Sequence, residues 1–134
     1  MEVLPTDVRV SLDPGALYAR RGMWEVLPLI ERSSVFFATE DELYTMTDEA
    51  DYHAGCREIA SLGPEVVVCK RGEEGAYLVS GAREIAFRPP GGAVVVDNTG
   101  AGDVFDAGFL AGLLLERPLD ACLAFAPRVA AKSL

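Results

Sequence analysis

The chain of 134 residues suits one domain, and half of its residues are hydrophobic, which is enough for a packed core. Its net charge of -9 excludes most nucleic-acid binders, which need a basic face for the phosphates. The most apolar run, Ala107–Leu115, is far shorter than the ~20 residues that span a bilayer, so we expect no membrane partner.

The hydrophobic pattern predicts strands that alternate with helices. We expect strands at 8–12, 34–38, 65–69, 76–79, 84–88 and 93–96, and helices at 22–32, after Thr39, at 51–62, 104–115 and 119–132. Such an order predicts an α/β fold with a mostly parallel sheet covered on both faces. The turn framed by Gly72 and Gly75 predicts a local antiparallel part.

The cysteines show no pattern of disulfides or of a metal site. Cys56, Cys69 and Cys122 are odd in number and far apart, no Cys-x-x-Cys occurs, and His53 is the only histidine. We therefore expect three reduced, mostly buried thiols in a cytoplasmic protein.

A glycine-rich loop from Asp97 to Asp103 joins the last expected strand to an apolar helix, and it contains Gly-Ala-Gly-Asp. Two glycines allow the backbone to approach a ligand closely, and the N–H groups at a helix start attract anions. An aspartate here would repel a bound phosphate. It is explained if it takes a proton from the hydroxyl that attacks the phosphate.

Other glycine motifs do not fit this loop. A dinucleotide-binding fingerprint would need a glycine at Phe105, and a P-loop would need Gly-Lys-Ser/Thr, but neither Lys70 nor Lys132 follows a glycine. The sequence also lacks the Gly-x-Ser-x-Gly of many hydrolases. The remaining alternative is a turn that only joins strand to helix.

The string from Asp97 to Phe109, DNTGAGDVFDAGF, resembles the second signature of PfkB-type, ribokinase-like carbohydrate kinases. The usual pattern is Asp-Thr-Thr-Gly-Ala-Gly-Asp-x-Phe-x-Ala-Gly, from which only Asn98 departs. The resemblance implies a three-layer α/β/α, Rossmann-like fold. It also implies an ATP-dependent phosphotransferase that acts on a primary hydroxyl of a sugar or sugar-like substrate.

The same resemblance gives the loop residues their roles. Asp103 would be the base that deprotonates the substrate hydroxyl. The backbone amides of Gly100, Ala101, Gly102 and Asp103 would form the anion hole for the transferred phosphoryl group of ATP.

A second segment, residues 66–76, resembles the family's strand followed by Lys/Thr-x-Gly-x-x-Gly, a turn that lies beside the nucleotide. Here Lys70 would pair with a phosphate, and Gly72 and Gly75 would allow the backbone to approach ATP. An ordinary hairpin with a solvated lysine explains the same residues.

Metal-binding residues are also implied. Glu42 matches the acid of the family's Asn-x-x-Glu motif, which faces Mg²⁺ through water, although Thr39 replaces the Asn. Thr39 and Glu42 equally fit a helix-capping box. Asp97 and Thr99 match positions that bind a monovalent cation such as K⁺ in some relatives, and they equally suit a turn.

A complete kinase of this kind is one domain of about 300 residues. We therefore expect residues 1–134 to be the carboxy-terminal, nucleotide-binding part of an incomplete domain. Relatives often dimerise through a lid that would lie outside this chain, so the resemblance implies a homodimer as one option. A non-catalytic nucleotide-binding or interaction remnant of such a kinase is the alternative function.

Overall fold

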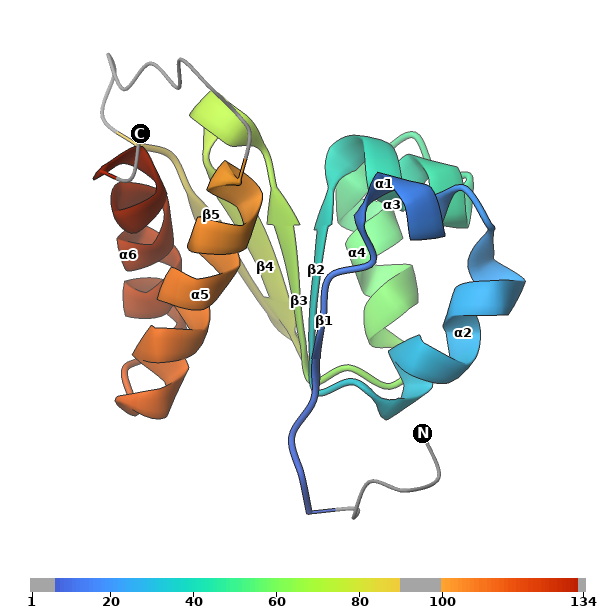
Figure 1. Ribbon diagram of the computed structural model, residues 1–134, viewed down its shortest axis with the longest axis horizontal. Coiled ribbons are helices and arrows are strands. Elements are labelled where there is room, and N and C mark those ends of the chain that lie inside the picture. The colour runs from blue at the N-terminus through green and yellow to red at the C-terminus, as the bar shows by residue number, and fades with distance from the viewer. Residues whose placement is uncertain (1–6, 90–99, 133–134) are drawn as a thin grey trace. The chain divides into compact units, whose positions relative to one another are not determined.

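The computed structural model describes residues 7–89 and 100–132 (Figure 1). The strands are β1 Ser11–Leu12, β2 Val35–Thr39, β3 Val66–Lys70, β4 Ala76–Ser80 and β5 Arg83–Phe87. The helices are α1 Gly15–Ala19, α2 Met23–Arg32, α3 Glu40–Thr47, α4 Tyr52–Ala60, α5 Ala101–Leu114 and α6 Leu119–Lys132, with a 3-10 turn at Gly72–Glu74. Within these residues no helix has both the length and the hydrophobicity that a membrane crossing requires.

The strands form one sheet in the order β1-β2-β3-β4-β5. β1 and β2 are parallel, with Ser11 opposite Val35, and β2 reaches β3 through α3 and α4, the crossover typical of parallel neighbours. The segments that join β3 to β4 and β4 to β5 are too short for a crossover, so these pairs are antiparallel. For the strands among the described residues, the predicted sheet and its local antiparallel part are confirmed.

By its internal contacts the chain divides into two compact units, and the division passes through β3, β4 and β5. The first unit comprises Met1–Cys69 and Leu78–Glu84, and the second comprises Lys70–Tyr77 and Ile85–Leu134.

The core of the first unit forms between β2 and the helices α1 to α4, which Figure 1 shows together on one side of β1, β2 and β3. In α2, Val26 and Ile30 lie one turn apart and are fully buried, because a spacing of four residues returns to the same face. Leu43 of α3 and Ile59 of α4 are equally buried. The apolar spacing that predicted these helices therefore marks their packed faces.

Local hydrogen bonds fix where α3 and α4 begin. Thr39 Oγ1 accepts from Glu42 N at 3.2 Å and Glu42 Oε1 accepts from Thr39 N at 3.0 Å, so the predicted capping box is present. At α4, Asp51 Oδ1 lies 2.7 Å from the His53 ring and accepts from the His53 backbone N–H. These bonds from His53, the ring first and the backbone second, hold the pKa of Asp51 below its ordinary value of 3.8.

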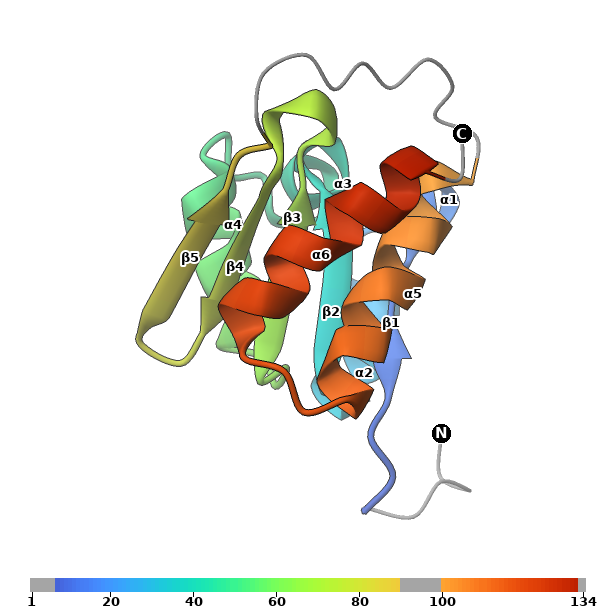
Figure 2. The ribbon, with the colours of Figure 1, turned by 90° about the vertical axis from the view of Figure 1, so that its left-hand side faces the viewer.

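In the second unit α5 and α6 lie side by side (Figure 2). Phe109 of α5 and Leu123 of α6 are fully buried. The helices approach closely because Gly112 faces Cys122, where an added Cβ would lie 2.8 Å from the cysteine Sγ. Burial raises the pKa of the Cys122 thiol above its ordinary value of 9.0.

Replacing Gly112 by Ala is therefore expected to lower the free energy of unfolding by about 1–3 kcal/mol, because the methyl group overpacks the α5–α6 contact. Urea denaturation measures the change. The double variant Gly112→Ala/Cys122→Ala, which removes the nearest sulfur, should be less destabilised than the sum of its two single variants. Strict additivity would show that the sulfur does not limit this contact.

Most elements lie within two residues of their expected bounds, and the larger differences concern α1, β1 and α5. α1 was not predicted, and β1 covers two of the five expected residues. α5 begins at Ala101 and not at Val104, because the glycine loop continues directly into the helix. The strand expected at 93–96 lies outside the described residues.

Candidate functional site

The start of α5 forms the centre of the candidate site in the second unit. Gly100 is the N-cap, with φ 78° and ψ -7°, a left-handed conformation that glycine adopts without strain. Ala101, Gly102 and Asp103 form the first helical turn. Their backbone N–H groups cannot bond within the helix, because no helical carbonyl lies four residues before them. Among the described residues no side chain caps this helix. Backbone donors and the positive end of the helix dipole thus meet at one point.

This turn is open to solvent. Gly100 and Asp103 are exposed, and Ala101 and Gly102 are half-buried. Because the four residues are consecutive, an anion bound at the amides would lie next to the Asp103 carboxylate. The arrangement can therefore hold a phosphate-like group and offer a base to a neighbouring hydroxyl.

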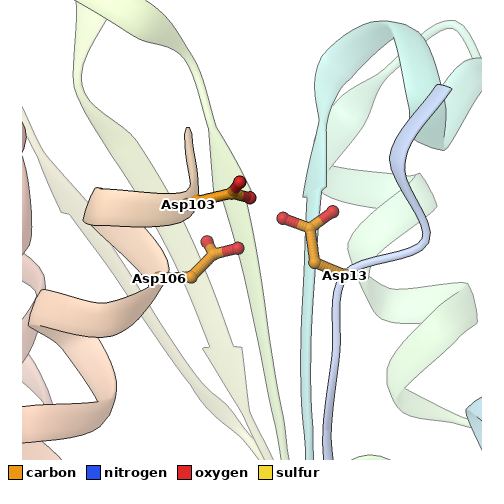
Figure 3. A group of neighbouring side chains, drawn as sticks. All are labelled: Asp13, Asp103 and Asp106. Carbon is orange, nitrogen blue, oxygen red and sulfur yellow. The ribbon is translucent and has the colours of Figure 1, made fainter. Parts of the chain in front are cut away.

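Asp103 and Asp106 project to the same side of α5, as a spacing of three residues requires (Figure 3). Their surroundings differ, since Asp103 is exposed and Asp106 is buried. Asp13, also drawn in Figure 3, belongs to the first unit, where its Oδ1 accepts a hydrogen bond from Gly15 N at 3.2 Å.

The partner of Asp106 within the second unit is Lys70, the last residue of β3. Lys70 Nζ lies 3.1 Å from Asp106 Oδ1 and 3.3 Å from Oδ2. The two side chains are only 11% and 12% exposed. An added Cβ on Gly102 would lie 3.3 Å from Lys70 Nζ, so the ammonium group is beside the first turn of α5. Lys70 is therefore not the solvated lysine of an ordinary hairpin.

The sequence analysis assigned no binding or catalytic role to Asp106. The residue occupies a variable position of the signature pattern, and it had only one visible signal, a charge within an otherwise apolar stretch from Val104 to Leu115. Nothing in the sequence pairs that charge with a lysine 36 residues earlier.

The two glycines of the turn after β3 have different surroundings. Gly75 has φ 102°, and a Cβ there would overlap the carbonyl oxygen of Phe87. Its own carbonyl accepts a hydrogen bond from Arg71 N at 2.9 Å. Gly72 has φ 60° and open space around the Cβ position. Gly75 is therefore required by the close approach of two backbones, whereas Gly72 leaves room for a ligand.

The remaining predicted site residues lie elsewhere. Glu42 belongs to the first unit, where one of its oxygens takes part in the capping box. Asp97 and Thr99, the candidates for a monovalent cation, lie outside the described residues.

Comparison with known proteins gives one consistent result. Residues 16–134 match the model of the pfkB family of carbohydrate kinases. An uncharacterized sugar kinase of Archaeoglobus fulgidus is 36% identical over 125 residues, which are 93% of this chain and 49% of the relative. A cytidine kinase of Thermococcus kodakarensis is 35% identical over 96 residues, 71% of this chain and 34% of the relative.

The solved structures agree with the sequence relatives. The crystal structure of a probable sugar kinase from Rhizobium etli superposes with a TM-score of 0.84 at 25% identity, over 93% of this chain and 38% of that one. This likeness confirms the predicted α/β fold class. The chain spans about half the length, or less, of the proteins it matches.

Proposed function

Because the chain belongs to the pfkB family of carbohydrate kinases, we propose that residues 1–134 form the carboxy-terminal, nucleotide-binding part of an ATP-dependent kinase. The reaction is transfer of the γ-phosphoryl group to a primary hydroxyl of a sugar or sugar-like substrate. One observation carries the proposal: an exposed, uncapped helix start at Gly100–Asp103 combines backbone donors with a carboxylate.

In this proposal each group at the helix start has one task. The amides of Gly100, Ala101, Gly102 and Asp103 stabilise the charge on the migrating phosphoryl group, since fixed donors need no reorganisation during transfer. Asp103 accepts the proton of the attacking hydroxyl, and its exposure leaves it within reach of a substrate.

The turn after β3 binds the nucleotide. Lys70 lies beside the first turn of α5, so its ammonium group can contact a phosphate of ATP held at the amides. The open space at Gly72 lets the backbone approach the nucleotide. Gly75 acts indirectly, since it gives the turn its shape.

The proposal includes two metal ions, Mg²⁺ and K⁺, which would be bound by side-chain oxygen atoms. Glu42 is the residue that would hold Mg²⁺ through water, and carboxylate oxygens are ligands that Mg²⁺ prefers. The capping box fits this task, because it holds the carboxylate in one orientation through Oε1. Bound Mg²⁺ supplies neutralising charge to the phosphates of ATP. Asp97 and Thr99 remain our candidates for K⁺.

We base the proposed cytoplasmic location on the state of the cysteines. Cys56, Cys69 and Cys122 are all buried and none of them forms a disulfide bond, which suits a reducing, cytoplasmic location. A homodimer that uses segments outside residues 1–134 remains an expectation.

Phosphoryl transfer by the complete polypeptide that contains this chain tests the proposal. With MgATP and a panel of ribose, fructose, a keto-deoxy sugar acid and cytidine, we expect ADP release that depends on at least one acceptor. Mass spectrometry should find the matching phosphorylated product. MgATP binding without turnover on any acceptor would instead support the non-catalytic remnant, and absence of both would contradict the whole proposal.

A further inference from the structure

The ion pair between Lys70 and Asp106 lies beside the first turn of α5, and the proposed reaction gives no task to Asp106. We propose that Asp106 is a positioning residue: its carboxylate holds the Lys70 ammonium group beside Gly102, where that group contacts a phosphate of ATP. This inference rests on the proposed function, because it concerns nucleotide binding at the same helix start.

Electrostatics at the helix start explain why Lys70 needs Asp106. The N-terminus of a helix carries a partial positive charge, which repels an ammonium group when no anion is bound. Asp106 has the opposite sign and lies within the second turn of α5, 3.1 Å from Lys70 Nζ. Its carboxylate therefore offsets the repulsion, and it keeps the lysine in place before the nucleotide arrives.

Positioning in advance favours binding because a lysine side chain is long and flexible. Fixing such a chain on binding costs rotamer entropy. With Lys70 already held by Asp106, that entropy is lost on folding and not on contact with the phosphate. A preorganised cation therefore raises nucleotide affinity even though it forms no additional contact.

Burial argues against a purely stabilising role. Both side chains are almost removed from water, with 11% and 12% exposure. The desolvation of two buried charges offsets much of their attraction, so an apolar pair of similar size stabilises a fold about as well. A buried ion pair next to an exposed anion-binding turn is better explained by a need for the cation at that place.

Gly102 makes this placement of the ammonium group sterically feasible. An added Cβ there would lie 3.3 Å from Lys70 Nζ, which is a tight contact. With no side chain at Gly102, the ammonium group can lie against the backbone whose amides would receive the phosphate. Lys70, Gly102 and Asp106 all belong to the second unit.

Asp106→Asn in the complete polypeptide tests the inference, since Asn keeps the size and removes the charge. We expect MgATP affinity, measured by calorimetry, to fall roughly tenfold or more, the usual effect of losing a charge-assisted contact. The KM for ATP should rise in parallel while kcat changes much less, because Asp103 is untouched. Lys70→Met should show a similar loss, and the double variant should bind no more weakly than Lys70→Met alone.

A charge-reversed pair separates positioning from stability. Lys70→Asp/Asp106→Lys rebuilds the ion pair with the cation on α5, so the melting temperature should recover relative to Asp106→Asn while MgATP affinity does not. Recovery of both would show a purely structural pair and overturn the inference, as would a folded Asp106→Asn variant with unchanged affinity. If Asp106→Asn does not fold, the melting temperature and the MgATP affinity of the reversed pair are compared with those of the wild-type protein instead.

MgATP binding by the wild-type protein distinguishes a failure of this inference from a failure of the proposed function. If wild type binds no MgATP, the proposed function fails and this inference fails with it. If wild type binds MgATP and Asp106→Asn binds equally well, only the positioning role is refuted.

Discussion

Replacing Asp103 by Asn in the complete polypeptide is expected to lower kcat for phosphoryl transfer by about 10²-fold or more. Asn keeps the size of the side chain but cannot accept a proton from the substrate hydroxyl. Asp103 is exposed in the first turn of α5, so its loss removes no packing. Steady-state assays of ADP release give kcat, and calorimetry with MgATP should show an affinity close to that of wild type.

Asp120→Asn is the matched control for this experiment. Asp120 is an exposed acid in the first turn of α6, and it belongs to the same unit as Asp103. Like Asp103→Asn, Asp120→Asn removes one negative charge from the first turn of a helix. Because Asp120 has no task in the proposed reaction, kcat should be unaffected. An Asp103→Asn enzyme with wild-type turnover would refute the assignment of Asp103 as the base.

Gly75→Ala is expected to cost about 3 kcal/mol or more of folding stability, a loss typical of severe backbone conflicts. The new methyl group would overlap the carbonyl oxygen of Phe87, and φ 102° is a conformation that side chains rarely adopt. The turn cannot move away easily, since the Gly75 carbonyl also accepts the hydrogen bond from Arg71 N. Urea denaturation measures the loss.

Gly72→Ala provides the comparison within the same turn. It has open space around its Cβ position and φ 60°, so only the left-handed conformation is penalised, by about 1 kcal/mol. Equal losses at the two positions would show that the approach of Phe87 does not determine the need for glycine. If Gly72→Ala weakens MgATP binding at nearly normal stability, the backbone approach proposed for Gly72 gains support.

Glu42 illustrates how two interpretations of one pattern can both hold. The capping box is confirmed by two reciprocal hydrogen bonds between Thr39 and Glu42. This local role uses one carboxylate oxygen and leaves the proposed contact with Mg²⁺ as a separate prediction. Sequence could not choose between the roles, because the same spacing of three residues serves both.

Much of the local structure was predictable because it depends on neighbours in the chain. The bounds of α6 at Leu119–Lys132 and the N-cap at Thr39 agree with the expected ones. The fully buried strand at Val66–Cys69 does as well, since an uninterrupted apolar run indicates burial on both faces. Short helices are difficult to predict in this way because they contain too few residues to show a helical spacing. α1 has only five residues and no side-chain cap.

By itself, the sequence determined the family, the order of most strands and helices, and the glycine loop with its aspartate, because these are carried by residues close together along the chain. Only the tertiary structure decided that Lys70 pairs with Asp106, that Gly75 meets Phe87, and that Gly112 meets Cys122. The physical reason is that such contacts depend on which faces of distant segments are brought together. Spacing along the chain does not encode that choice.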